Sequence, residues 1–321
     1  MLKGFDPEFR DFEHYILSIT EQIWEGRGID LIRRWYGANC IVRTPGGFSD
    51  DVEAVVASTN ATLAEFPDRR LLGEDVIWAG DEDEGFLSSH RIISTMHHWG
   101  DGVFGKASHK PVVVRTVADC AAKDGQIYEE WLVRDQGAIA NCIGSSPKEM
   151  AEAWVNADRE AGRDVGFFTP AIDKPGPYHR DLSTEAPAVF YQSVQEALWN
   201  ASAISKVAEA YHPAISVGAP SGETAVGHAG VEGLLFDYLS SFPGAEFKTE
   251  HLIVRQDLGR PARVALRWSL TGTHTGRGRF GTPTGKPIYI MGINHAEVRD
   301  GMITAEWVLI DEIAVWKQIL A

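Results

Sequence analysis

Two histidines and an aspartate near the C-terminus have the residue types and strand spacing for acid/base chemistry. Alternate residues of a strand share a face, so Asp311 lies with Trp307 at the end of an apolar stripe. A carboxyl group among apolar neighbours has a raised pKa, which suits proton transfer near neutral pH. Hairpin pairing would bring His295 close to Asp311, and His274 shares a face with Trp268. Such a set could remove a proton alpha to a carbonyl and return it elsewhere.

The first half of the chain offers a more polar set of side chains. Asp119 and Asp135 are expected to lie close together, and two neighbouring carboxyl groups push their pKa values apart so that one remains protonated. Arg115 on the same strand face would pair with them or bind a substrate carboxylate through two hydrogen bonds. His90 and His98 complete the set. A polar pocket of this kind predicts a polar ligand.

Structural roles are open for all of these residues. A single histidine on an apolar strand is often a core residue with satisfied hydrogen bonds, and Asp311 precedes a helical pattern that it could cap. Asp119 and Arg115 could belong to a buried ion pair. Trp131 and Trp307 are expected in the core or in a pocket wall rather than in the chemistry.

Three motifs resemble cofactor-binding or metal-binding patterns, but none of them predicts a cofactor or a metal ion. The glycines from Gly276 to Gly281 have dinucleotide-binding spacing, but no helix follows to bind a phosphate, so we expect a loop over a pocket mouth. Gly285-Lys286 lacks the other residues of a P-loop. His97 and His98 are adjacent and point to opposite faces of a strand, so they do not form a metal site.

The chain repeats itself at a long interval. The segment from Lys123 to Trp131 returns from Arg299 to Trp307, and the offset between Asp124 and Asp300 is 300 − 124 = 176. Pairs that keep the same offset are Phe66-Pro67 with Phe242-Pro243, Arg91 with Arg267, His98 with His274, and Lys110-Pro111 with Lys286-Pro287; Trp24 with Trp199 and Tyr36 with Tyr211 are one residue closer. We therefore predict two domains, residues 1–144 and 187–321, joined by a linker rich in proline and glycine at 145–186.

Composition narrows the class of protein. The chain has 321 residues and a formal net charge of −15 without a basic cluster, so nucleic acid is not an expected partner. Three cysteines without a paired framework fit a reducing compartment. The N-terminus has no apolar leader, and no apolar run is long enough to span a bilayer. A cytoplasmic location without membrane attachment is predicted.

Each copy has helical patterns first and strand patterns afterwards. In the first copy, helical spacing covers about 8–36 and 50–66, and four strand-like segments follow between 69 and 136. This order predicts an α+β fold in which N-terminal helices pack on a curved antiparallel sheet. The concavity between the layers would hold a small molecule.

The second copy resembles the SnoaL-like polyketide cyclase family of the NTF2-like superfamily. The resemblance lies in Gly272-Thr273-His274-Thr275-Gly276, in Phe280 to Lys286, in Arg299 to Ile303, and in Glu306-Trp307 with Asp311. The first copy looks like a diverged relative that has Met96-His97-His98 in place of Gly-Thr-His.

This resemblance implies a cone-shaped α+β domain with a deep apolar pocket. In such cyclases, acid/base chemistry closes a ring by an intramolecular aldol reaction without a metal or cofactor. The catalytic aspartate of the family lies in a Trp-x-x-x-Asp segment, which corresponds to Asp311 here and to Asp135 in the first copy. Domains of this superfamily pair through their sheets, which implies an internal pseudo-dimer or a homodimer.

The predicted function is cofactor-independent acid/base catalysis of the cyclase, isomerase or lyase kind on a small oxygenated carbonyl compound. The predicted catalytic residues are Asp311, His295, Asp135 and Asp119. The predicted substrate-binding residues are His274, Trp307, Trp268, His98, His90, Arg115 and Trp131. The alternative is a non-catalytic ligand-binding or scaffolding protein, because a fold does not determine a function.

Overall fold

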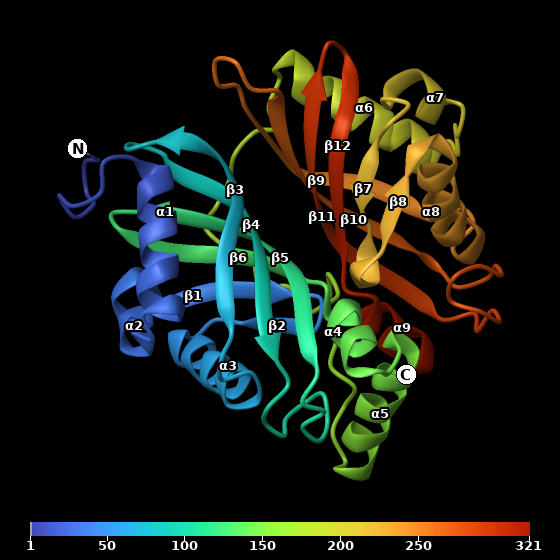
Figure 1. The fold of residues 1–321 in the computed structure, drawn as a ribbon, viewed down its shortest axis with the longest axis horizontal. Coiled ribbons are helices and arrows are strands. Elements are labelled where there is room, and N and C mark those ends of the chain that lie inside the picture. The colour runs from blue at the N-terminus through green and yellow to red at the C-terminus, as the bar shows by residue number, and fades with distance from the viewer. Residues whose placement is uncertain (1) are drawn as a thin grey trace. The chain divides into compact units, whose positions relative to one another are not determined.

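The computed structural model describes residues 2–321, which form two compact units (Figure 1). The N-terminal unit contains the chain up to Ser146 and the segment Phe168–Arg180, and the C-terminal unit contains Pro147–Phe167 and Asp181–Ala321. Residues of the segment 145–186, predicted to link the two copies, thus contribute to both units. No helix in the described part of the chain is long and apolar enough to cross a membrane.

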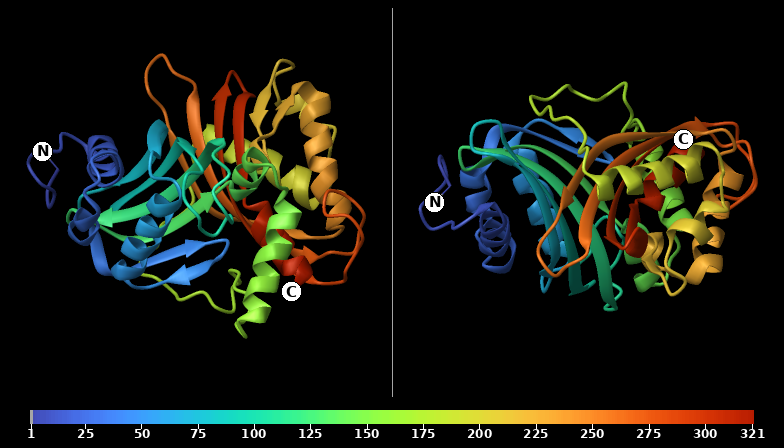
Figure 2. Two further views of the ribbon diagram at one scale, coloured as in Figure 1. Left: turned by 60° about the horizontal axis from the view of Figure 1, so that its bottom comes forward. Right: turned by 90° about the horizontal axis from the view of Figure 1, so that it is seen from above.

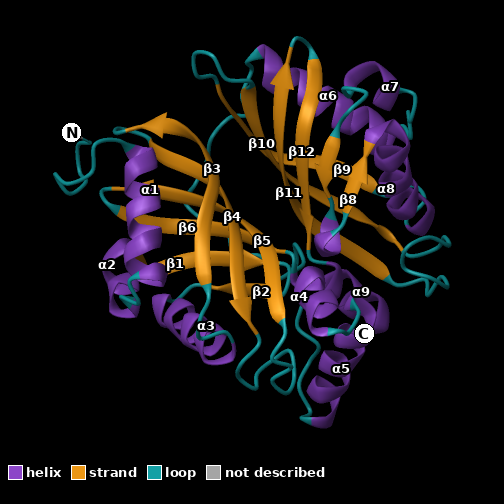
Figure 3. Cartoon of the chain, viewed as in Figure 1, coloured by secondary structure: helices purple, strands orange, loops and turns teal. Residues whose placement is uncertain are grey.

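In the N-terminal unit, helices precede a strand meander, as the sequence predicts. Its elements are α1 (Phe12–Thr20), the π-helical turn η1 (Glu21–Glu25), the 3-10 turn η2 (Ile29–Leu31), α2 (Ile32–Trp35), β1 (Tyr36–Thr44), β2 (Gly47–Ser49), α3 (Val52–Glu65), β3 (Arg70–Asp81), β4 (Gly85–His97), β5 (Pro111–Lys123), β6 (Gln126–Arg134) and α4 (Gln136–Ile143). The strands form one six-stranded sheet in the order β2-β1-β6-β5-β4-β3. Figure 3 shows α1 and α3 along one face of this sheet.

The C-terminal unit repeats the same topology. Its elements are α5 (Pro147–Glu160), α6 (Ala186–Asn200), α7 (Lys206–Ala210), β7 (Ser216–Gly218), the 3-10 turn η3 (Pro220–Gly222), β8 (Thr224–Val226), α8 (Gly227–Ser241), β9 (Glu246–Arg255), β10 (Ala262–Thr273), β11 (Pro287–Arg299), β12 (Met302–Ile310) and α9 (Glu312–Leu320). The sheet order is β8-β7-β12-β11-β10-β9. The bounds of β11 and β12 each exceed those of β5 and β6 by 287 − 111 = 302 − 126 = 176. The two units are therefore tandem copies of one α+β fold, and Figure 2 shows each sheet curved with helices on one face.

Each sheet is mixed rather than fully antiparallel. The four-stranded meander is antiparallel, but β1 pairs in parallel with β6 and β7 pairs in parallel with β12. A parallel pair needs a long crossover connection, which α3 and the strands β3 to β5 provide in the N-terminal unit. The predicted meander is confirmed, and a parallel strand extends each sheet beside β6 or β12.

A repeated turn sets the register of the last hairpin in both units. Asp124 and Gly125 have φ angles of 51° and 76°, and Asp300 and Gly301 have φ angles of 52° and 76°. Two consecutive residues with positive φ form the turn that matches the twist of a two-residue hairpin, and Asp-Gly is a favoured pair for it. The Asp-Gly repeat therefore reflects backbone geometry.

Two parts of the segment between the copies are held by different contacts. Within the C-terminal unit, Arg159 of α5 donates to the carbonyl oxygen of Leu320 at 2.8 Å. Within the N-terminal unit, the buried Arg43 binds Asp173 and the carbonyl of Lys174, at 2.5 and 2.6 Å. These contacts explain why the segment divides between the units.

Candidate functional site

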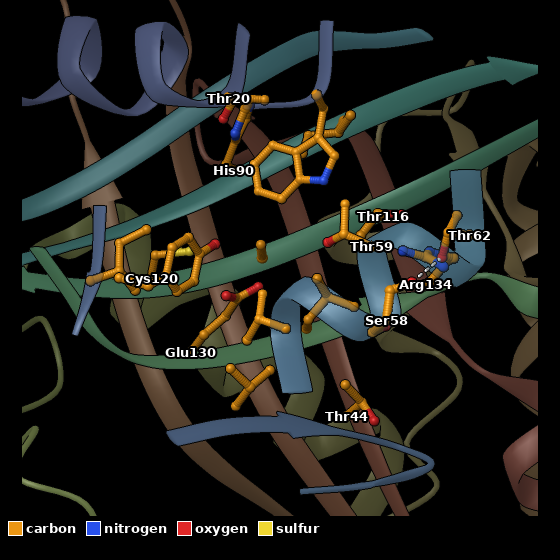
Figure 4. Close-up of a pocket in the computed structure, with 18 of the residues that line it drawn as sticks. Thr20, Thr44, Ser58, Thr59, Thr62, His90, Thr116, Cys120, Glu130 and Arg134 are labelled. Atoms are coloured by element: carbon orange, nitrogen blue, oxygen red, sulfur yellow. Dashed lines mark hydrogen bonds between the residues drawn. The ribbon is translucent and has the colours of Figure 1, made fainter. Parts of the chain in front are cut away.

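A cavity of about 460 Å³ opens between the helices and the concave sheet face of the N-terminal unit. Its walls come from α1, α3, β1, β4, β5 and β6 (Figure 4). The ionisable or polar residues in its lining include Glu130, His90, Arg69, Arg134, Tyr36, Thr59, Thr62 and Thr116. The apolar ones include Ile16, Ile19, Trp24, Ile92, Ala118 and Leu132. The volume suits a small organic molecule.

Strand alternation decides which side chains reach the cavity. On β6, Glu130, Leu132 and Arg134 line it, so Trp131 and Asp135 have the other parity. The side chains of Glu130 and His90 enter the cavity from β6 and β4 (Figure 4). Across β5, Ala118 pairs with both His90 and Leu132. This register separates the Cα atoms of Glu130 and His90 by about 12 Å, enough for a ligand to lie between the side chains.

Glu130 is the ionisable group of the cavity that is best suited to proton transfer. Its side chain is only 4% exposed. Burial raises the pKa of Glu130 to about 7, although a hydrogen bond with Tyr36 and the charge of Arg134 act in the opposite direction. A carboxyl group with this pKa is present in both protonation states near neutral pH, so it can accept and donate a proton.

His90 and Thr116 present polar atoms that lack partners. Within the described chain, neither His90 Nε2 nor Thr116 Oγ1 has a hydrogen-bond partner, and both atoms are buried. Burial, helped by the charge of Arg91, lowers the pKa of His90 to about 4. His90 is therefore a neutral imidazole at pH 7, able to donate or accept one hydrogen bond. Buried polar atoms are usually satisfied, so these two favour a polar ligand in the cavity.

The corresponding carboxyl group of the C-terminal unit is already saturated. Glu306 receives hydrogen bonds from the hydroxyl groups of Tyr191 at 2.5 Å and Tyr211 at 3.1 Å, and from Gln195 Nε2 at 3.1 Å. Burial raises the pKa of Glu306 to about 7, against the effect of these three hydrogen bonds. The carboxyl group has the same environment-shifted pKa as Glu130 but no free face for a ligand.

Large side chains fill the interior of the C-terminal unit. Trp268 is fully buried and donates to Asn294 Oδ1 at 2.8 Å. A Cβ atom on Gly292 would lie 2.1 Å from the Trp268 ring, so the indole packs directly on the strand backbone. The matching positions of the N-terminal unit are 175 residues earlier for helix α6, which corresponds to α1, and 176 residues earlier for the strands. These positions hold smaller residues. Tyr191, Gln195, Trp268 and Asn294 correspond to Ile16, Thr20, Ile92 and Ala118. These substitutions open the N-terminal cavity.

The predicted aspartates lie at helix N-termini. Asp135 is the N-cap of α4 and accepts from Ala138 N at 3.2 Å. Asp311 is the N-cap of α9 and accepts from Ile313 N and Ala314 N at 3.1 and 3.3 Å. Both have the strand parity opposite to the glutamate that faces the helices. The capping role considered from the sequence for Asp311 is observed, and Asp135 has the same role. The catalytic role of these residues stays a prediction.

The predicted pairs of ionisable residues are separated along their strands. Asp119 lies opposite Trp131, and His295 lies opposite Trp307. Asp135 and Asp311 are four residues beyond Trp131 and Trp307 along the chain, which places their Cα atoms about 13 Å from the Cα atoms of those tryptophans. Arg115 forms two hydrogen bonds with Glu74, at 2.9 and 3.0 Å, and the Arg43 guanidinium stacks on the Trp131 ring at 4.8 Å.

Among the histidines predicted to bind substrate, only His90 lines the cavity. His98 contacts Glu65 Oε1 at 3.2 Å and Ser108 Oγ at 3.1 Å, and its backbone N–H donates to Lys110 O. His274 contacts Thr284 Oγ1 at 3.2 Å and packs against a phenylalanine ring. Each histidine contacts the long loop that follows its strand, which is β4 for His98 and β10 for His274.

The residues that sequence reasoning missed are Glu130, Arg69, Arg134 and Tyr36. Glu130 belongs to the Glu-Trp pair that recurs in both copies, so the repeat did mark the position. The signal was the charge of its counterpart Glu306, the only charged residue in the apolar strand Met302–Ile310. The aspartate that ends the apolar stripe shares its strand face with the tryptophan, and this pattern favours the opposite face of the strand.

No group of three or more histidine, cysteine or acidic side chains within the described chain is arranged to hold a metal ion.

The family model of the SnoaL-like polyketide cyclases matches residues 189–319. Those residues belong to the SnoaL-like polyketide cyclase family. The N-terminal unit shares the topology of this SnoaL-like domain, and the matched range does not include the cavity. No curated protein matches the chain in sequence.

Several solved structures are similar to one SnoaL-like unit. A candidate SnoaL-like polyketide cyclase from Jannaschia sp. CCS1 is 17% identical, with a TM-score of 0.38, over 44% of this chain and 99% of that one. The candidate polyketide cyclase IdmH from Streptomyces antibioticus is 21% identical, with a TM-score of 0.36, over 43% of this chain and 100% of that one. A SnoaL-like polyketide cyclase from Agrobacterium tumefaciens is 18% identical, with a TM-score of 0.32, over 40% and 94%.

Proposed function

We propose that the N-terminal unit is a cofactor-independent acid/base catalyst that moves a proton on a small carbonyl compound. The observation that supports this most strongly is the Glu130 carboxyl group, with a pKa of about 7, inside a cavity of about 460 Å³. A general base is most effective when its pKa is close to the working pH. Cyclisation and isomerisation both begin with such a proton transfer.

In the proposed reaction, the Glu130 carboxylate removes a proton from the carbon next to a carbonyl group. The C–H electron pair forms the enolate, and its oxygen accepts a hydrogen bond from the neutral His90 imidazole, in the tautomer that carries the proton on Nε2. In a cyclisation, the enolate carbon attacks a second carbonyl of the same molecule, and protonated Glu130 returns its proton to the new alkoxide. In an isomerisation, the proton returns to another carbon.

Tyr36 would orient the catalytic carboxylate. Its hydrogen bonding with Glu130 acts to lower the pKa of that carboxyl group and so stabilises the ionised form. Burial and the nearby carboxylate raise the pKa of Tyr36 far above its ordinary value, so the hydroxyl remains a donor throughout the reaction.

The C-terminal unit has a different proposed role. Its glutamate is occupied by three side chains and Trp268 packs on the strand backbone, which favours a structural domain without turnover. The family resemblance supports a competing assignment, in which Asp311 with His295, and Asp135 with Asp119, carry the proton. A purely ligand-binding protein is the second candidate, because a cavity with polar groups in its lining also suits binding alone.

The test uses a panel of small diketones and keto esters in deuterated water. The wild-type protein should accelerate deuterium exchange at the carbon between or beside the carbonyl groups, measured by NMR. Glu130→Gln keeps the side-chain shape and should reduce the rate by about 10²- to 10⁴-fold. Asp311→Asn and Asp135→Asn should leave it nearly unchanged. Loss of activity in an aspartate variant alone would support the competing assignment, and binding without exchange in any protein would support the binder.

A further inference from the structure

One end of the N-terminal cavity contains a buried arginine without a counter-ion. Arg69 follows the turn after α3 and immediately precedes β3, and its side chain lines the cavity although it is only 6% exposed. Its backbone carbonyl accepts a hydrogen bond from Arg27, which also donates to Pro67 O. The backbone contacts fix the start of β3 and thereby the direction from which the guanidinium enters the cavity.

Within the described chain, the Arg69 guanidinium forms no ion pair or hydrogen bond, and the charge of Glu25 is the one acidic influence on its pKa, smaller than the effect of burial. The other buried arginines differ. Arg43 is paired with Glu129 at 2.7 Å, and Arg263 is paired with Asp257 at 2.5 Å. A buried charge without a partner is costly. Arg69 is therefore a group whose partner is expected to come from a ligand.

A second guanidinium increases the positive charge at this end. Arg134, the last residue of β6, also lines the cavity, and its charge acts on Arg69. Burial, and then the charges of Arg134 and Arg27, lower the pKa of Arg69 to about 9, against the opposing charge of Glu25, so Arg69 remains charged at neutral pH. Two like charges face a cavity in a protein whose formal net charge is −15. An anion between them would relieve both burial and repulsion.

The comparison of the two copies links this charge to the cavity. At the offset of 176, Arg69 corresponds to Ala245 and Arg134 to Ile310. The filled C-terminal interior thus has apolar residues at both positions, and the open N-terminal cavity has arginines. Structural needs of the fold do not explain these arginines, because the same fold forms without them.

We propose that Arg69, together with Arg134, binds a carboxylate group of the ligand, which makes the ligand a keto acid rather than a neutral ketone. A carboxylate matches the planar guanidinium through two parallel hydrogen bonds. Glu130 and Arg134 lie on the same face of β6, four residues apart, so about 13 Å separates their Cα atoms. The carboxylate is therefore separated from the reacting carbonyl by several bonds. The reacting end of this ligand rests on the proposed function, whereas the anion site does not.

The test measures binding by calorimetry with three probes, 5-oxohexanoate, its methyl ester and a phosphate monoester of similar length. The wild-type protein should bind the carboxylate at least about tenfold more tightly than the ester, because a charge-assisted pair is lost in the ester. Arg69→Met removes the charge and should abolish this preference while leaving ester binding unchanged. Arg33→Met removes a surface charge instead and should keep the preference.

Further variants keep the two proposals separable. Arg69→Lys keeps a positive charge without the planar guanidinium and should retain only part of the preference. This variant replaces Arg69→Met in the test if Arg69→Met fails to fold. Glu130→Gln should still prefer the carboxylate although it loses proton exchange. Equal binding of acid and ester by the wild type, no carboxylate-dependent binding up to the solubility of the probe, or an undiminished preference in Arg69→Met would overturn the inference. Tight binding of the phosphate monoester alone would also overturn it, in favour of a phosphate site.

Discussion

Glu130 and Glu306 occupy the same strand position in two tandem copies, 306 − 130 = 176 residues apart, and burial raises the pKa of each to about 7. Glu130 faces a cavity, whereas Glu306 is surrounded by Tyr191, Tyr211 and Gln195. One position thus yields a candidate catalytic base in one copy and a satisfied core residue in the other. The difference comes from the neighbours rather than from the carboxyl group.

The pH dependence of proton exchange should follow the ionisation of Glu130. The ionised form is the base, and its pKa is about 7. The rate at low substrate concentration should rise about tenfold for each pH unit below about 7 and level off above it. The measurement is a pH profile of deuterium exchange. A profile already flat from about pH 5 upwards would assign the base to a carboxyl group of ordinary pKa.

The stability of the fold should fall as pH rises, in part because of Glu306. Its folded pKa of about 7 exceeds the ordinary value of 4.5. The protonated carboxyl is therefore favoured by the fold, and this contribution is complete below about pH 4.5 and is lost as pH rises through about 7. Chemical denaturation should show that the free energy of unfolding of the wild type falls between about pH 5 and about pH 8. The fall should be smaller in Glu306→Gln, by up to about 3 kcal/mol. Equal pH dependence in both proteins would contradict the shifted pKa.

Rebuilding the packing of the C-terminal unit in the N-terminal unit should close the cavity. Trp268 packs on Gly292 in the C-terminal unit, and the matching residues are Ile92 and Thr116. The double variant Ile92→Trp/Thr116→Gly should fold but lose ligand binding and proton exchange, because the indole would fill the space. Calorimetry and circular dichroism measure the two outcomes. Thr116→Gly alone is the control and should still bind, weakened only by the loss of one hydrogen bond to the ligand. Unchanged binding by the folded double variant would place the site elsewhere.

The helix-capping aspartates should matter for stability. Asp135→Ala removes the N-cap of α4 and should cost about 1 kcal/mol in the free energy of unfolding. Asp135→Asn should cost much less, since asparagine caps helices almost as well. Thermal denaturation of the two variants makes the comparison. An Asp135→Asn protein as unstable as Asp135→Ala would show that the charge, rather than the cap, matters.

Much of the fold could be predicted from the sequence because its signals are local or repeated. The order of helices and strands follows from apolar spacing, and the Asp-Gly hairpins follow from turn chemistry. The parallel pairing of β1 with β6 could not be predicted, because nothing in a short strand such as Tyr36–Thr44 specifies a partner so far along the chain. Pairing between strands so far apart in the chain depends on tertiary packing.

The candidate site was harder to predict for two physical reasons. First, the parity of β6 decides whether Glu130 or Asp135 faces the helices, and both parities contain apolar residues. Second, an open cavity depends on the combined volumes of residues from separate elements, such as Ile16 on α1 and Ile92 on β4. His90 was predicted as a member of the polar set of the first copy, together with Asp119, Asp135 and Arg115. The repeat shows from the sequence that Ile92 stands where the second copy has Trp268. The effect of this difference on the cavity follows only from the packing in the structure.

The most direct test of the central claim is an NMR titration of the glutamate side-chain carboxyl carbons, labelled with ¹³C. Two carboxyl groups should titrate with a midpoint near pH 7, one of them absent in Glu130→Gln and the other in Glu306→Gln. Ligand binding in the N-terminal cavity should shift the Glu130 signal and leave that of Glu306 unchanged. A Glu130 midpoint near pH 4.5, or a ligand that perturbs only Glu306, would contradict the account.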